Sequence, residues 1–205
     1  MIKVETFCDT FLNANTYLIS DDQYAVIIDP ANNIKTLNKF VGEKQVVAIL
    51  LTHGHYDHFK EIEKYIKEYN VKCYLHKEAY KKIFNVETSY ASSFGENKVP
   101  NIKEEVFIML KENQILQFGQ IKINTWFTPG HTNCSVIYFI DDLMFSGDTL
   151  FKNSIGRTDL ATGNLVAMRN SLDRIKKLKT NYFVYPGHDE STTLFDELKN
   201  NLYLK

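Results

Sequence analysis

Residues 46–58, VVAILLTHGHYDH, decide the fold of this chain. The unbroken apolar run at 46–51 is typical of a strand buried on both faces. The polar stretch that follows holds three of the chain's six histidines, at positions 53, 55 and 58. Because open α/β sheets place their ligand crevices at strand ends, we expect a binding site at this point of the chain.

His53, His55, Asp57 and His58 are candidate metal ligands, since imidazole and carboxylate bind zinc and neighbouring transition metals. Strand-like alternation puts His53 and His55 on the same side, and Gly54 between them permits a tight turn. A helical pattern at 59–69 follows, so Asp57 and His58 can point at a second spot nearby. A histidine-rich surface loop is the ordinary alternative, and the density of the cluster disfavours it.

Four further motifs accompany this cluster in a fixed order. VIIDP at 26–30 precedes it, and TPGHT at 128–132, FSGDT at 145–149 and YPGH at 185–188 follow it. Together with His53-x-His55-x-Asp57-His58, these motifs resemble the signature of the metallo-β-lactamase-fold superfamily, from about Thr16 to the C-terminus. The resemblance implies an α/β (α+β) fold: a four-layer αββα sandwich of two facing mixed sheets with helices outside.

The resemblance also implies a binuclear metal centre. It assigns His53, His55 and His131 to one site, Asp57, His58 and His188 to the other, and Asp148 to a bridging position. Two such ions, roughly 3.5–4 Å apart, would hold an attacking hydroxide between them. The carboxylates of the centre, Asp57 and Asp148, are the expected catalytic residues, and Asp29 would orient a ligand without touching metal. Zinc is the expected metal, with iron or manganese as alternatives.

Arg157 is a candidate substrate-binding residue. The segment SIGRTDL at 154–160 resembles a motif of glyoxalase II-like and persulfide dioxygenase-like branches. A structural pair between Arg157 and Asp159 that braces the site is an equally good interpretation. Ala161-Thr162 stands where Pro-Gly or similar is usual, and Asn133-Cys134 departs from the Pro-Gly common after the third motif. These departures leave all the expected ligands in place.

The remaining reactive side chains have no place in the motifs. His76 is expected to have a structural or pocket-wall role. Cys8, Cys73 and Cys134 have no metal-type spacing and no disulfide framework, which agrees with a reducing compartment. Each is expected to be a small buried residue, and Cys134, close to His131, is the one that could line the site.

Length and charge restrict the possible partners. The 205 residues, 44% of them hydrophobic, fit one domain spanning 1–205. Lys and Arg total 24 against 25 Asp and Glu, a net charge of −1, which favours neither a nucleic acid nor an acidic membrane as partner. No signal peptide or membrane span is recognisable, so we expect a cytoplasmic protein with a small-molecule substrate. The oligomeric state is not predicted.

Periodicity and turn signals predict the remaining elements. Strands are predicted at 17–19, 24–28, 46–51, 71–75, 107–110, 114–118, 120–127, 135–140, 143–145 and 181–185, and helices at 34–41, 59–69, 165–175 and 194–202. Asn164 is the expected N-cap of the helix at 165–175. Residues 85–104 lack periodicity and are predicted to be a long loop, with Phe94 available to pack over a pocket.

The resemblance implies hydrolysis of an acyl thioester such as S-lactoylglutathione, as in the single-domain glyoxalase II-like (hydroxyacylglutathione hydrolase-like) branch. The main alternative is a persulfide dioxygenase with one iron held by His53, His131 and Asp148. An RNA-processing nuclease of the same fold is less favoured because no basic arm is visible. A β-lactamase would be expected to carry an export leader, and none is recognisable.

Overall fold

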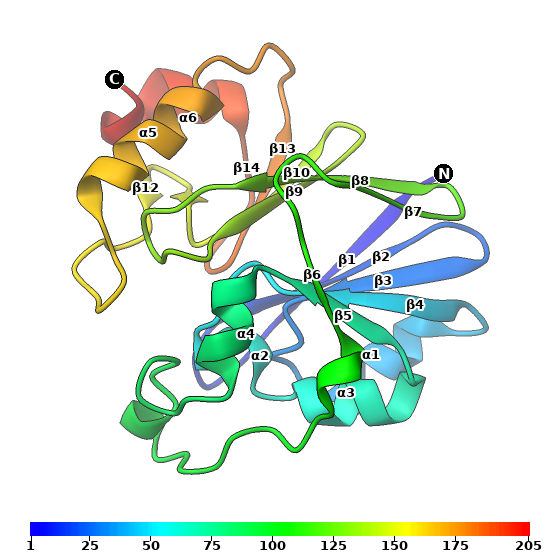
Figure 1. The fold of residues 1–205 in the computed structure, drawn as a ribbon. Helices are drawn as coiled ribbons and strands as arrows, with labels where there is room; N and C mark the ends of the chain where they lie inside the picture. Colours follow the sequence, from blue (N-terminus) through cyan, green and yellow to red (C-terminus); the bar gives the residue numbers. More distant parts are fainter.

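The computed structural model describes residues 1–205, which form two six-stranded sheets facing each other (Figure 1). The first sheet contains β1 (Lys3–Cys8), β2 (Asn15–Ser20), β3 (Tyr24–Ile28), β4 (Gln45–Leu50), β5 (Lys72–Leu75) and β6 (Phe107–Met109), in that order. The second has the order β14 (Thr192–Thr193), β13 (Phe183–Pro186), β10 (Leu143–Gly147), β9 (Val136–Ile140), β8 (Ile121–Phe127) and β7 (Ile115–Phe118). A separate hairpin pairs β11 (Leu150–Phe151) with β12 (Ser154–Ile155).

Both sheets are mixed. In the first, β1, β2 and β3 pair antiparallel, and β3, β4, β5 and β6 pair parallel. In the second, β10 and β13 are parallel and the other pairs are antiparallel. Parallel neighbours end at the same edge of a sheet, so the segments that leave β4, β10 and β13 can meet there.

The helices lie on the outer faces of the two sheets (Figure 1). Those associated with the first sheet are α1 (Ile34–Val41), α2 (Tyr56–Phe59), α3 (Ile62–Tyr69) and α4 (Lys77–Ile83). Those associated with the second are α5 (Leu165–Ile175) and α6 (Leu194–Asn200). Short 3₁₀ turns occur at η1 (Ser92–Phe94), η2 (Glu104–Val106) and η3 (Leu202–Leu204). None of the helices combines the length and the apolar character needed to cross a bilayer.

Alternating side chains divide the core into three apolar layers. On β2, Leu18 packs under the helices of the first sheet, whereas its neighbour Ile19 packs between the sheets. Ile27 and Ile28 on β3 divide in the same way, because successive strand residues point to opposite faces. A third layer joins the second sheet to α5, α6 and η3. Four layers of secondary structure result, which confirms the predicted αββα arrangement.

Several predicted boundaries are wrong. The helix expected at 59–69 is two helices: α2 begins inside the histidine cluster at Tyr56, and the chain breaks at Lys60 and Glu61 before α3. The strand predicted at 107–110 ends one residue earlier, at Met109, and pairs parallel to β5 in the first sheet. The final helix stops at Asn200, because the side chain of Asn201 accepts a hydrogen bond from Tyr203 N and starts η3. After the strand predicted at 181–185, the chain adds a further short strand, β14.

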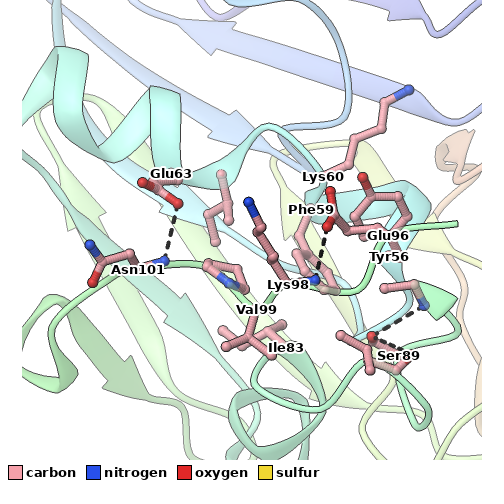
Figure 2. Close-up of a pocket in the computed structure, with 14 residues that line it drawn as sticks. Tyr56, Phe59, Lys60, Glu63, Ile83, Ser89, Glu96, Lys98, Val99 and Asn101 are labelled. Atoms are coloured by element: carbon pink, nitrogen blue, oxygen red, sulfur yellow. Dashed lines mark hydrogen bonds between the residues drawn. The ribbon is translucent and has the colours of Figure 1, made fainter.

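Residues 85–104, hereafter the strap, are not structureless. The side chain of Asn85 caps Glu87 N and Thr88 N, and Tyr56 N donates to Ser89 O at 2.9 Å. A cavity of about 360 Å³ lies between residues 96–101 and the helices α2 and α3, and Figure 2 shows the residues that line it. At its far end Asn101 N donates to Glu63 Oε2 at 3.1 Å, so the strap is held to the first sheet's helices at both ends.

Candidate metal centre

The predicted ligands converge at one edge of the sandwich, where several chain segments leave their strands. His53 and His55 follow β4, whereas Asp57 and His58 lie in α2. Three further side chains follow strands of the second sheet: His131 after β8, Asp148 after β10 and His188 after β13. Each of these side chains comes directly after a strand or a strand–helix turn, which is why motifs far apart in sequence meet.

The ligand atoms form three overlapping groups, each within 4.8 Å. The groups are His53, His55 and His131; His53, His58 and Asp148; and Asp57, His58 and His188. The first and last groups are the two sites that the sequence predicted. The middle group joins them through Asp148.

Asp148 lies between the two predicted sites. Its Oδ1 is 3.4 Å from His58 Nε2, and its Oδ2 is 3.4 Å from His131 Nε2 and 3.6 Å from His188 Nε2. The carboxylate therefore lies close to histidines of both groups, with Oδ2 near one histidine of each, as a ligand shared by the two sites would.

Backbone carbonyls assign the tautomers of two histidines. His131 Nδ1 lies 2.8 Å from Arg157 O, and His188 Nδ1 lies 3.1 Å from Asn13 O. Since a carbonyl oxygen can only accept, each Nδ1 carries the proton and each Nε2 presents a lone pair to the centre. This is the arrangement typical of metal-ligating histidines.

Asp29 orients two more of the histidines, as predicted for a residue that does not itself join the ligand groups. Its Oδ2 accepts from His58 Nδ1 at 2.9 Å and from Thr52 Oγ1 at 2.6 Å, and its Oδ1 accepts from Thr52 N at 2.8 Å. Because the Thr52 hydroxyl donates to Asp29, it accepts from His53 Nδ1, 3.1 Å away. His53 and His58 therefore both direct Nε2 at the centre.

The donor atoms fit divalent metal ions. His53 Nε2 and Asp148 Oδ1 are buried and have no hydrogen-bond partner, which is rare for buried polar atoms and needs an explanation. His58 Nε2 and His188 Nε2 are 3.3 Å apart. Two nitrogens bound to one tetrahedral zinc ion lie about 3.3 Å apart, given Zn–N distances of about 2.0–2.1 Å. The spacing of these two nitrogens therefore fits a single zinc ion bound by both.

Burial and neighbouring charges divide the histidines into two classes. Burial, with the neighbouring histidines, lowers the pKa of His53, and burial with His131 lowers the pKa of His55 to about 2. Both are therefore neutral, the form that binds metal. Burial also acts to lower the pKa of His58, but the carboxylates around it, led by Asp57 and Asp148, raise it to about 10. Without metal, His58 is a cation among carboxylates.

A cavity of about 290 Å³ opens over the centre. Besides the ligands, it is lined by Tyr90, Ser93 and Phe94 from the strap and by Arg157 and Leu160 from the opposite side. The Phe94 ring also stacks against Tyr56, with ring centroids 6.2 Å apart. Phe94 therefore packs over a pocket, as the sequence suggested.

Arg157 lies at the mouth of this cavity and is paired with Asp159. Its Nε and one terminal nitrogen donate to the two Asp159 oxygens, each at 2.7 Å. Both side chains are nonetheless about two-thirds exposed, at 63% and 67%. The pair predicted as one alternative is present, and the guanidinium still faces solvent beside the cavity.

The other reactive residues lie away from the centre. His76 caps α4, because its Nδ1 accepts from Glu78 N at 3.1 Å, which confirms a structural role. Cys73 and Cys134 are buried as predicted, but Cys8 is exposed, so that prediction is wrong. Cys134 packs in the apolar layer under the first sheet's helices and does not line the cavity.

Gly54 is needed for space rather than for the tight turn we expected. Its φ lies outside the left-handed range. A Cβ at this position would lie 2.8 Å from Lys82 Cβ and 3.2 Å from Ala79 Cα. The missing side chain therefore lets α4 pack directly against the loop that carries His53 and His55.

Sequence reasoning missed two residues of the site, Thr52 and Tyr90. Thr52 relays the Asp29 contact to His53, and its place immediately before His53 is the signal that could have revealed it. Tyr90 lines the cavity and packs edge-to-face on His55, with ring centroids 5.2 Å apart. No local pattern identifies Tyr90, because the fold of the strap brings it to the site.

The sequence and the fold identify the superfamily to which this chain belongs. Residues 9–188 match the sequence model of the Metallo-beta-lactamase superfamily, and the chain belongs to that superfamily. It is 33% identical over 199 residues to the probable metallo-hydrolase YqgX of Bacillus subtilis (strain 168), covering 94% of this chain and 93% of that protein.

Two solved structures are also similar over their whole length. The crystal structure of the BLEG-1 B3 metallo-beta-lactamase superimposes with a TM-score of 0.90 at 28% identity, covering 100% of both chains. That of TTHA1623 in a di-iron-bound form superimposes with a TM-score of 0.86 at 28% identity, covering 98% of this chain and 100% of the other. Family and geometry together make this chain a metal-dependent hydrolase of the superfamily that binds divalent metal.

Proposed function

We propose that this protein is a binuclear hydrolase of small acyl thioesters such as S-lactoylglutathione, of the glyoxalase II-like type, with zinc as its metal. The observation that carries the proposal is the position of Asp148, whose carboxylate lies within 3.6 Å of histidines from both ligand groups. A centre with seven side-chain ligands is larger than one tetrahedral ion needs. A cytoplasmic location agrees with its three unpaired thiols.

The bound ions would supply an activated water and polarise the thioester carbonyl. The protein's part is to hold the ligands and the substrate. Asp29 and the carbonyls of Asn13 and Arg157 keep the histidine rings in place. A thiolate is a good leaving group, because free thiols have a pKa of about 8.5, so the reaction needs no strong general acid.

The substrate would enter between the strap and the opposite wall. Tyr90, Phe94 and Leu160 give an apolar surface for the acyl group. Arg157, exposed at the mouth, can bind a carboxylate of the thiol carrier. The cavity volume of about 290 Å³ suits the acyl end of a thioester and leaves the carrier at the surface.

Persulfide dioxygenation at one iron is the second candidate. The metal of this candidate, iron, is present in the di-iron-bound form of TTHA1623, which is 28% identical to this chain and has nearly the same fold. His53, His131 and Asp148 would form the two-histidine, one-carboxylate set that this chemistry uses. Here the remaining ligands would have no role in holding the metal.

Metal analysis of the purified protein, coupled to three assays, tests the proposal. We expect close to two ions per chain and hydrolysis of S-lactoylglutathione. Oxygen uptake with glutathione persulfide and hydrolysis of a chromogenic cephalosporin should both be much slower. One ion per fully active chain, or oxygen uptake with no thioester hydrolysis, would overturn the proposal in favour of the dioxygenase. The cephalosporin assay is included because BLEG-1, which has nearly the same fold, is named as a metallo-beta-lactamase.

A further inference from the structure

Residues 157–163, hereafter the arc, connect β12 to the start of α5 and form one wall of the cavity. The tip of the arc is held by two side chains from distant parts of the chain. Tyr90 of the strap accepts at its hydroxyl from Ala161 N, at 2.7 Å. Lys82 of α4 donates from Nζ to Thr162 Oγ1, at 2.8 Å.

The start of the arc, its root, is held by backbone contacts with two residues of the metal centre, Asp148 and His131. A Cβ on Gly156 would lie 1.9 Å from Asp148 O, so only glycine allows this contact between backbones. The next residue, Arg157, accepts from His131 Nδ1 at its carbonyl. The position of the arc between root and tip therefore depends on Tyr90 and Lys82.

Tyr90 adopts a costly conformation to reach the arc. Its φ of 63° lies in the left-handed region, which a bulky residue such as tyrosine rarely occupies. The ring packs edge-to-face on His55 on its way to Ala161. Strain of this kind persists only where the surrounding contacts determine it.

The contact between Lys82 and Thr162 is equally unusual. The residue is only 4% exposed, and its ammonium forms no ion pair. Burying a cation without a carboxylate partner costs free energy. The pairing of this ammonium with a neutral hydroxyl therefore indicates that the contact is functional. Gly54 provides the space that lets α4 bring Lys82 to this place.

The two contacts restrict the residues that positions 161 and 162 can hold. A proline at 161 would have no amide hydrogen to donate, and a glycine at 162 would have no hydroxyl to accept. The first contact therefore needs any residue except proline at 161, and the second needs a hydroxyl or another acceptor at 162.

We infer that Tyr90 and Lys82 determine acyl-group specificity by clamping the arc against the strap and α4. The clamp sets the distance between Leu160 on the arc and Phe94 on the strap, the two apolar walls of the cavity. A clamped wall favours short acyl groups, and a released wall admits longer ones at the cost of weaker binding of short ones. This inference rests on the proposed thioesterase function.

Tyr90→Phe removes the hydroxyl and keeps the ring against His55. In the metal-loaded protein it should raise KM for S-lactoylglutathione by about two- to tenfold, the effect of one hydrogen bond, with kcat and metal content retained. The ratio of kcat/KM between S-lactoylglutathione and S-hexanoylglutathione should shift toward the longer substrate by a similar factor. Lys82→Met, which keeps the aliphatic stem, should act in the same direction. Tyr203→Phe is the matched control, since its exposed ring lies on η3 and its hydroxyl has no partner.

A second measurement needs no activity. The Ala161 amide should exchange with deuterium faster in Tyr90→Phe than in wild type, whereas Tyr203→Phe should match wild type. Unchanged exchange would overturn the clamp, even if the wild type hydrolyses no thioester. Absence of thioester hydrolysis in the wild type alone would overturn the proposed function. Faster exchange of the Ala161 amide with an unaltered kcat/KM ratio between the two substrates would overturn the inference. A lower kcat with loss of metal in Tyr90→Phe would also overturn it, because Tyr90 would then have only a structural role.

Discussion

The buried carboxylate of Asp29 accepts a hydrogen bond from His58 Nδ1 at 2.9 Å, although the two residues are 29 positions apart. The same oxygen accepts from Thr52, which in turn contacts His53. One side chain outside the ligand groups therefore sets the orientation of a ring in each of the two predicted metal sites.

Asp29→Asn should weaken metal binding by about 10- to 100-fold, the usual effect of losing a partner of a ligating histidine. The new amide would offer a donor where His58 Nδ1 and Thr52 Oγ1 also donate, which would drive the His58 proton to Nε2. Competition with a chromogenic chelator measures the affinity. Asp21→Asn is the control, because Asp21 is also buried and bonds backbone amides, at the opposite end of β3. Equal metal affinities in Asp29→Asn and Asp21→Asn would contradict the role of Asp29 in orienting the histidines.

Metal binding should release protons at neutral pH. In the metal-free protein the surrounding carboxylates raise the pKa of His58 to about 10 against the effect of burial, so Nε2 is protonated at pH 7. The ion must displace this proton, and its apparent affinity should therefore rise with pH, about tenfold per unit for each proton displaced. Calorimetry in buffers of different ionisation enthalpy counts the protons. A pH-independent affinity between pH 6 and 9 would show that His58 is already neutral.

His188→Ala separates the hydrolase from the dioxygenase. In the proposed binuclear centre it should lose or weaken one ion and lower thioester turnover on the order of 10²-fold, equivalent to about 2.7 kcal/mol. In a mononuclear iron centre on His53, His131 and Asp148, the iron should stay bound and oxygen uptake should fall only slightly. Metal content and both activities are measured on the same preparation. Wild-type thioesterase turnover in His188→Ala would rule out the hydrolase proposal.

Arg157→Ala should raise KM with little change in kcat, because the guanidinium is exposed at the cavity mouth and would bind the carrier rather than the reacting carbonyl. A charge-assisted hydrogen bond of about 1.5–3 kcal/mol corresponds to a rise of about 10- to 100-fold. The melting temperature should not change, since the Arg157–Asp159 pair is largely in solvent. Arg169→Ala, an exposed arginine on α5, is the control. A lower melting temperature or metal content with unchanged KM would favour a bracing role for the pair.

Predictions from the sequence were correct where a single residue or a single strand is enough to produce the predicted feature. The side chain of Asn164 caps α5 as predicted, because Asn at this position can accept from the backbone of the first helical turn whatever surrounds it. The buried strand at 46–51 follows from its composition alone. The split between α2 and α3 escaped prediction, because the apolar spacing continues through Lys60 and Glu61 while the backbone does not.

The sequence by itself determined the candidate ligand residues, their order and the element each one follows, because His53, His131, Asp148 and His188 all lie in short segments attached to strand ends. Only the tertiary structure decided which atoms face the centre and what encloses it. The tautomers depend on Asp29 and on two backbone carbonyls from other parts of the chain. The cavity wall depends on Tyr90 and Ala161, 71 positions apart. Such contacts have no local pattern, because they arise when separate segments are packed together, and their strength depends on burial that a linear sequence does not display.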